Sequence, residues 1–196
     1  MLEISVKTHV NPRLRQILQE IGPMTRRELF SVGANGLRIA VRRHLRREGA
    51  IRHATAGRLG AEPTQHIIKG AARVTSFSSE HGAVVSVPIA GITRAYRDLT
   101  ILPVQAKALT IPIAAASYGH RVRELSRLGW NVFRPNGSDV LFGRRDGDET
   151  ATALYALKKS VVVRRDRTLL PDDETIADAI NIPMIKSIQL KIRGAA

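Results

Sequence analysis

The residues with the most evident chemistry are seven arginines in one short stretch of the chain. They are Arg38, Arg42, Arg43, Arg46, Arg47, Arg52 and Arg58, with Glu48 as the one acidic residue among them. On a helix, one face would carry Arg38, Arg42 and Arg46 at intervals of four residues. Like charges at this spacing repel one another. A guanidinium is a planar fork of donors that matches phosphate or carboxylate. The run therefore predicts contact with a polyanion or partner protein, although a solvated helix face or ion pairs between subunits would also explain it.

The residues that could bind a metal lack the necessary spacing. The six histidines are scattered, and no pair has the spacing of a helical metal site with an accompanying glutamate. Asp146, Asp148 and Glu149 resemble a fragment of a calcium loop, but the further oxygen ligands and the closing glutamate are missing. Asp146-Gly147 has the form of a tight turn between strands. We therefore expect no metal ion.

Residues for nucleophilic catalysis or nucleotide binding are equally poorly placed. A Ser-His-Asp catalytic triad could be imagined from the residue types of Ser117, His120 and Asp98. However, no serine lies in a Gly-x-Ser-x-Gly elbow. The Gly33-to-Gly36 segment lacks both the Walker lysine and the Rossmann glycine spacing. We expect no catalytic residue and no cofactor. An enzyme site assembled from scattered residues is the alternative.

Composition indicates a basic protein with a packed core. The net charge is +14, hydrophobic residues make up 43% of the 196 residues, and aromatic residues only 4%. The core must therefore be mainly aliphatic, and the charge favours anionic partners. The chain has no cysteine, which excludes disulfides and thiolate chemistry. No apolar run approaches the roughly 20 residues that span a bilayer, so we expect a soluble, cytoplasmic protein with no membrane partner.

The N-terminal fifty residues predict a strand and two helices. Residues 2–6 alternate apolar and polar side chains, and Asn11-Pro12 has the form of an N-cap with proline at the first helical position. A second helix is predicted from about residue 25 to residue 48, with Gly33 and Gly36 placing a kink in its middle. Its core face would carry Leu29, Val32, Leu37, Ala40, Val41 and Leu45. Residues 54–63 are small and polar and predict a mobile loop.

The middle of the chain predicts short antiparallel strands. One hairpin is expected from residues 73–78 and 83–89, and another around Asn136-Gly137 from residues 131–134 and 140–144. Further strands are expected at residues 99–102, 109–113, 150–157 and 160–164, and short helices at residues 64–72 and 121–128.

The C-terminal segment predicts one more helix, which completes an α+β fold. Asp172, Asp173 and Glu174 suit the positive end of a helix dipole, and Pro183 is expected to kink or split the helix. We predict a single α+β domain over residues 1–196. Its antiparallel sheet of hairpins (about residues 65–165) would be packed by N-terminal helices (about 11–50) and a C-terminal helix (about 172–192).

The order of these segments resembles the phage virion morphogenesis family, the neck and tail-completion proteins of tailed bacteriophages. The resemblance covers most of the chain and is most specific from residue 65 onward. It is carried by residues 65–72 before the first hairpin, Lys-Ala-Leu-Thr-Ile-Pro-Ile at 107–113, Leu-Tyr-Ala-Leu-Lys-Lys-Ser-Val at 154–161 and Leu-Leu-Pro at 169–171.

The resemblance implies a structural virion protein of the head–tail junction, assembled in the host cytoplasm. Such proteins form rings, here expected to be hexamers, that complete the neck or tail end and allow heads to join tails. Expected partners are further copies of the chain, a connector or stopper, the tail terminator or tube, and genomic DNA contacted without sequence preference. A tail terminator and a stand-alone basic nucleic-acid-binding protein are the alternatives.

Overall fold

The computed structural model describes residues 2–194 and has a mixed α+β fold, as predicted. The chain forms two compact units. Unit 1 contains the residues up to Ile51, Gln65–Arg97 and the residues from Arg165 onward, and unit 2 contains Arg52–Thr64 and Asp98–Arg164. Whether the two units unfold together is a question of cooperativity, so the prediction of a single domain stays a prediction.

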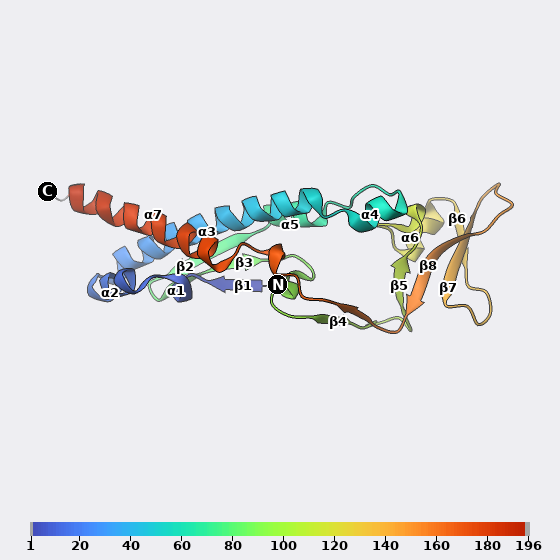
Figure 1. Cartoon of the computed structure of the whole chain (residues 1–196), viewed down its shortest axis with the longest axis horizontal. Helices are drawn as coiled ribbons and strands as arrows, with labels where there is room; N and C mark the ends of the chain where they lie inside the picture. Colours follow the sequence, from blue (N-terminus) through green and yellow to red (C-terminus); the bar gives the residue numbers. More distant parts are fainter. Residues whose placement is uncertain (1, 195–196) are drawn as a thin grey trace. The chain divides into compact units, whose positions relative to one another are not determined.

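Unit 1 combines a three-stranded antiparallel sheet with two long helices (Figure 1). Its helices are α1 (Val6–His9), α2 (Pro12–Glu20), α3 (Pro23–Ile51), α5 (His66–Ala72) and α7 (Asp173–Gly194), with short 3₁₀ turns η1 (Ile92–Ala95) and η3 (Arg167–Leu169). Its strands are β1 (Leu2–Ser5), β2 (Thr75–Ser79) and β3 (Gly82–Val87), in the order β1-β3-β2. The predicted N-cap of α2 is confirmed, since the Asn11 side chain accepts a hydrogen bond from the Leu14 amide at 2.9 Å.

The core of unit 1 lies between α3, α7, α5 and one face of the sheet. Leu37, Val41 and Leu45 of α3 are fully buried with Ile180 and Met184 of α7. The predicted apolar face of α3 is therefore largely correct, although Val32 and Ala40 are only half-buried. Burial of these aliphatic side chains is the main force that holds a helix of this length in place.

The two glycines of α3 lie where α7 packs against the helix. Helix α3 is unbroken from Pro23 to Ile51, and a kink in its middle stays a prediction. A Cβ at position 36 would collide with the Ala179 carbonyl oxygen and would come within 2.9 Å of Pro183 Cγ. Glycine thus lets α7 approach the α3 backbone closely. Inside a helix, the amide of residue 183 would donate a hydrogen bond to the carbonyl of Ala179, but proline has no amide hydrogen. The Ala179 carbonyl lies against Gly36 instead.

Helix α7 also differs from its prediction. It continues through Pro183 from Asp173 to Gly194, so the predicted split is wrong, while the kink given as the alternative stays a prediction. The physical reason is tertiary: Ile176, Ile180 and Met184, on both sides of the proline, are all buried in the same core. Lys191 also forms an ion pair with Glu28 of α3.

Unit 2 is built around a four-stranded antiparallel sheet, in the order β5-β8-β7-β6. Its strands are β5 (Leu109–Pro112), β6 (Trp130–Phe133), β7 (Val140–Arg145) and β8 (Thr152–Lys158), and a separate two-stranded ribbon pairs β4 (Leu99–Ile101) with β9 (Val161–Val163). The helices are α4 (Ala54–Leu59), α6 (Val122–Arg127) and the 3₁₀ turn η2 (Ala115–Ser117). Leu125, Leu154 and Tyr155 form its small buried cluster. The predicted hairpin at Asn136-Gly137 is confirmed by the β6–β7 pairing.

The predicted mobile loop at residues 54–63 is wrong for its first half, which forms α4. Ala56 is fully buried, and Gly60 ends the helix in the left-handed conformation with φ of +64°. A buried alanine and a glycine C-cap are sufficient to fix one helical segment here. None of the helices in the described part of the chain combines the length and hydropathy needed to cross a bilayer.

Candidate functional site

Helix α3 places three of the seven candidate arginines on one face. Arg38, Arg42 and Arg46 follow one another at intervals of four residues, and Ser31 and Asn35 continue the same face toward the N-terminus. Arg38 Nη2 donates to Asn35 Oδ1 at 2.6 Å. The core residues of α3 occupy a different side of the helix, so this face forms a continuous polar stripe.

Arg42 has a structural role within this stripe. Its Nη2 donates hydrogen bonds to the Ala72 carbonyl oxygen at 3.0 Å and to the Val74 carbonyl oxygen at 2.7 Å. These carbonyls lie at and just beyond the end of α5, where helical carbonyls lack intrahelical partners. Arg42 therefore ties α5 and the start of β2 to α3, and its replacement would affect folding as well as any contact with a partner.

Arg47 belongs to a separate group of polar contacts. His44 Nε2 lies 2.9 Å from the Thr168 carbonyl oxygen and must donate to it, because a carbonyl only accepts. In the neutral ring His44 Nδ1 then accepts from Arg47 Nη2 at 3.4 Å, and Arg47 Nε lies 3.7 Å from Glu48 Oε1. His44 thus connects α3 to η3, and Arg47 contacts only neighbors on its own helix, His44 and Glu48, in the interactions described.

Two adjoining hollows lie beside the polar stripe, and we call them together the α3–β2 trough. One, of about 500 Å³, is lined by Ser31, Val32, Asn35, Arg38 and Arg42 of α3 and by Val74, Thr75 and Ser76. The other, of about 320 Å³, is lined by Ile39, Arg42, Arg43 and Arg46. They share Arg42. No carboxylate is among the described residues that line either hollow.

The polar character of β2 creates one wall of this trough. Ser76 pairs with Val85 and Ser78 with Ala83, so both serines lie on the sheet face that β3 turns toward the core. At these positions an apolar side chain would extend the core. Ser76 is instead exposed, and β2 is an edge strand of the sheet.

The remaining arginines of the predicted set lie elsewhere. Arg52 and Arg58 belong to unit 2, where Arg58 is exposed on α4. The structure therefore brings four of the seven, Arg38, Arg42, Arg43 and Arg46, to one trough. Sequence reasoning missed Ser31, Asn35, Thr75 and Ser76. The helical spacing of Ser31 and Asn35 ahead of Arg38 was the available signal for two of them.

The serine and tyrosine near the center of unit 2 have structural hydrogen bonds. Ser117 is fully buried, and its hydroxyl lies 2.6 Å from the Leu154 carbonyl oxygen and 2.9 Å from that of Ala114. The Tyr155 hydroxyl donates to the His120 carbonyl oxygen at 2.9 Å, and burial raises the pKa of this tyrosine above its usual value. Both hydroxyls join the sheet to the segment between β5 and α6.

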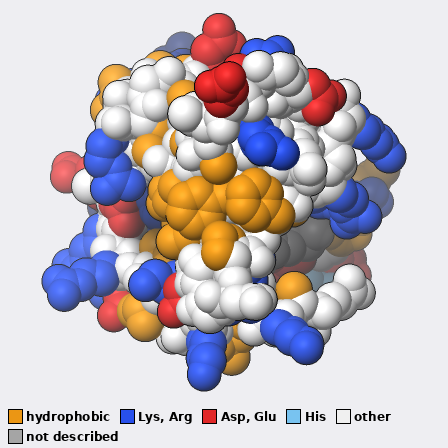
Figure 2. All heavy atoms as spheres, turned by 90° about the vertical axis from the view of Figure 1, so that its right-hand side faces the viewer, with side chains coloured by type: hydrophobic (Ala, Val, Ile, Leu, Met, Phe, Trp, Pro, Cys, Tyr) orange, Lys and Arg blue, Asp and Glu red, His pale blue; other side chains and the backbone are white. Residues whose placement is uncertain are grey.

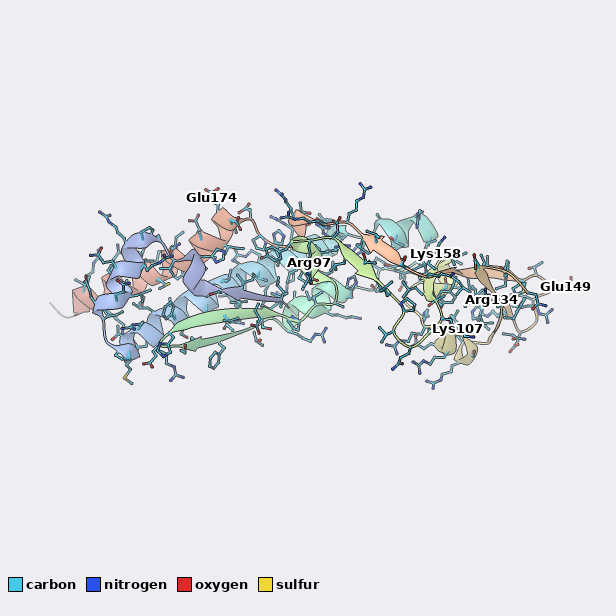
Figure 3. The ribbon with its side chains drawn as sticks, turned by 90° about the horizontal axis from the view of Figure 1, so that it is seen from below. Arg97, Lys107, Arg134, Glu149, Lys158 and Glu174 are labelled. Atoms are coloured by element: carbon cyan, nitrogen blue, oxygen red, sulfur yellow. The ribbon has the colours of Figure 1, made fainter. Side chains whose placement is uncertain are left out.

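The carboxylates at the β7–β8 connection form an exposed turn. Gly147 has φ of +91°, and the Asp148 amide donates to the Arg145 carbonyl oxygen at 3.0 Å. Figure 3 shows Glu149 at the tip of this connection. In the part of the chain that the structure describes, no group of three histidines or carboxylates is arranged to hold a metal ion.

His66 gives unit 1 a pH dependence. Burial, followed by the charge of Arg94, lowers the pKa of His66 below its usual 6.5. The unfolded chain then binds this proton more readily than the folded chain, so stability falls as the pH drops through 6.5. We expect the melting temperature to fall between about pH 7 and about pH 5, and less steeply in His66→Gln. Parallel melting curves for the two proteins would contradict this. Asp172, whose pKa is lowered mainly by the Thr175 hydroxyl, titrates below 3.8 and does not interfere.

Comparisons with known proteins found no match: no protein-family model, no curated protein and no solved structure resembles the chain significantly.

Proposed function

We propose that this protein is a structural subunit of the head–tail junction of a tailed bacteriophage, where copies form a ring that completes the neck or tail end. The proposal combines the resemblance of residues 65–171 to the phage virion morphogenesis family with one structural observation. That observation is an apolar sheet face in unit 2 that is left partly open to solvent.

The sheet of unit 2 has one buried face and one partly exposed apolar face. Helix α6 and η2 pack on the face that carries Leu154. On the other face Phe133 pairs with Phe142, and their rings stack with centroids 6.3 Å apart. Further along, Val140, Ala156 and Ile111 are register partners, so they share this face. Phe133 is 42% exposed. We call this surface the Phe133 face.

The Phe133 face also carries charged side chains. Arg144 and Lys158 are exposed at positions that alternate onto the same side of β7 and β8. Figure 2 looks onto the side where β6 and β7 lie and shows hydrophobic side chains at its center, with both basic and acidic side chains around them. An apolar patch with a charged rim is typical of a surface that buries itself against a protein, and we assign it to the neighboring subunit of the ring.

The β4–β9 ribbon supplies a second surface suited to assembly. A two-stranded ribbon is marginally stable alone, and this one has only three residues in each strand. Ile101, Leu102 and Val162 are 46%, 60% and 64% exposed. Its unpaired edges and apolar side chains suit strand addition by another chain.

The decisive experiment disrupts this gene in the parent phage and images the particles by electron microscopy. We expect separate filled heads and finished tails, because heads would lack the junction that joins them. Restoring the gene in trans should restore joined virions. Overlong, irregular tails would assign the protein to tail termination, and normal joined virions would refute a role in assembly.

A further inference from the structure

We propose that the α3–β2 trough binds the phosphodiester backbone of nucleic acid without regard to base sequence. The inference goes beyond the proposed place in the virion and does not depend on it, because it rests on the trough of a single chain.

The donors that face the trough match phosphate. Arg38, Arg43 and Arg46 supply guanidinium groups, while Ser76 and Asn35 supply a hydroxyl and an amide on opposite walls. Arginine, serine, threonine and asparagine are among the side chains that contact phosphate and sugar in protein–DNA complexes. An acidic residue in the trough would oppose phosphate binding, and the lining residues include none.

The spacing of the arginines suits a linear polyanion. Helical rise places Arg38 and Arg46 about 12 Å apart along the axis of α3, which corresponds to about three to four nucleotides of one strand. Arg42 lies midway, but its Nη2 is already held by the backbone beyond α5. A single phosphate would engage only part of this row, whereas a strand would follow its whole length.

The trough has the means to hold a backbone and no means to read bases. Stacking on unpaired bases requires aromatic side chains, and none lines either hollow. The walls come from the side of a helix and the edge of a sheet and offer no element that projects into a DNA groove. Binding should therefore depend on salt concentration and be indifferent to sequence.

The test must separate the trough from the charge of the whole protein, which is +14. The probe is a fluorescein-labelled duplex of about 20 base pairs and mixed sequence, titrated by fluorescence anisotropy from about 50 to about 200 mM salt. The trough variant is Arg38→Gln with Arg46→Gln. The matched control is Arg123→Gln with Arg127→Gln, two exposed arginines four residues apart on α6 in unit 2. Both variants lose the same charge, and both leave Arg42 in place.

We expect the affinity of the trough variant for the duplex to fall at least about tenfold. The slope of log K against log salt concentration should become shallower by about 1.8, because each of the two lost phosphate contacts contributes about 0.9. The control should change little by comparison. Circular dichroism melts should show that both variants remain folded.

Three outcomes would overturn the proposal. The first is equal weakening in the two variants, which would assign binding to overall charge. The second is the absence of duplex binding by the wild-type protein at low salt. The third is a poly-glutamate peptide that competes as strongly as unlabelled duplex of equal charge, which would assign the trough to an acidic protein segment. Each outcome is independent of the imaging of gene-disrupted phage, so the two proposals can fail separately.

Discussion

Replacing Gly36 with alanine should destabilise unit 1 by about 3 kcal/mol, the upper part of the usual range for overpacking. The new Cβ would meet a backbone atom, the Ala179 carbonyl oxygen, and also Pro183 Cγ. Neither atom can move by a simple rotamer change, so α7 would have to shift away from α3. The buried contacts of Ile180 and Met184 would then be disturbed. Urea unfolding followed by circular dichroism would measure the loss.

Gly33→Ala on the same helix is the matched control. Its Cβ would come within 2.8 Å of Met184 Sδ, the flexible part of an adaptable side chain. Alanine also favors the helix over glycine by up to about 1 kcal/mol at both positions. We therefore expect a change of about 1 kcal/mol or less for Gly33→Ala. Equal losses for the two variants would show that the Ala179 carbonyl does not set the distance between the helices.

Replacing Phe133 with glutamate should abolish self-association of the protein. Phe133 stacks on Phe142 within the Phe133 face, and an unpaired carboxylate buried in an apolar interface costs several kcal/mol. A loss of that size shifts the association constant by at least about a hundredfold. Size-exclusion chromatography with light scattering should give the mass of several chains for the wild type and of one chain for the variant.

Leu128→Glu is the corresponding control. Leu128 is 50% exposed, belongs to the same unit, and directly follows α6, which packs on the opposite face of the sheet. The same charge at this position should leave assembly unchanged. A wild-type protein that remains a single chain at high concentration would contradict the assignment of the Phe133 face to a neighboring subunit.

Local signals predicted most of the elements. Asn11-Pro12 predicted the start of α2, and Asn136-Gly137 the β6–β7 hairpin, because caps and tight turns are decided by a few adjacent residues. The antiparallel α+β class followed from the same local patterns.

The errors arose where a distant segment decides the outcome. Glycine weakens an isolated helix, so the local pattern pointed to a weak point at Gly36, but α7 occupies the space that glycine leaves. Pro183 likewise fits inside α7 because residues on both its sides are anchored in one core. Local patterns also carried no sign of the two compact units, because unit 2 consists of two segments separated by more than thirty residues of unit 1.

The site was predicted in part for the same reason. The four-residue spacing of Arg38, Arg42 and Arg46 predicted that they lie on one face of a helix, because helical periodicity depends only on neighboring residues. The bonds from Arg42 to the backbone at residues 72 and 74 required the tertiary structure. So did the second wall of the trough, which comes from Thr75 and Ser76 on a strand some thirty residues away.

The distribution of the two units along the chain sets an order of completion during synthesis. Every residue of unit 2 has been translated once residue 164 is added, whereas unit 1 still lacks η3 and α7. Until then the glycine face of α3 has no helix against it, although α3 was among the first elements made. Helix α7 thus closes a core that earlier elements begin, and a chain that ended before Ile176 would leave that core open, because the buried side chains of α7 are Ile176, Ile180 and Met184.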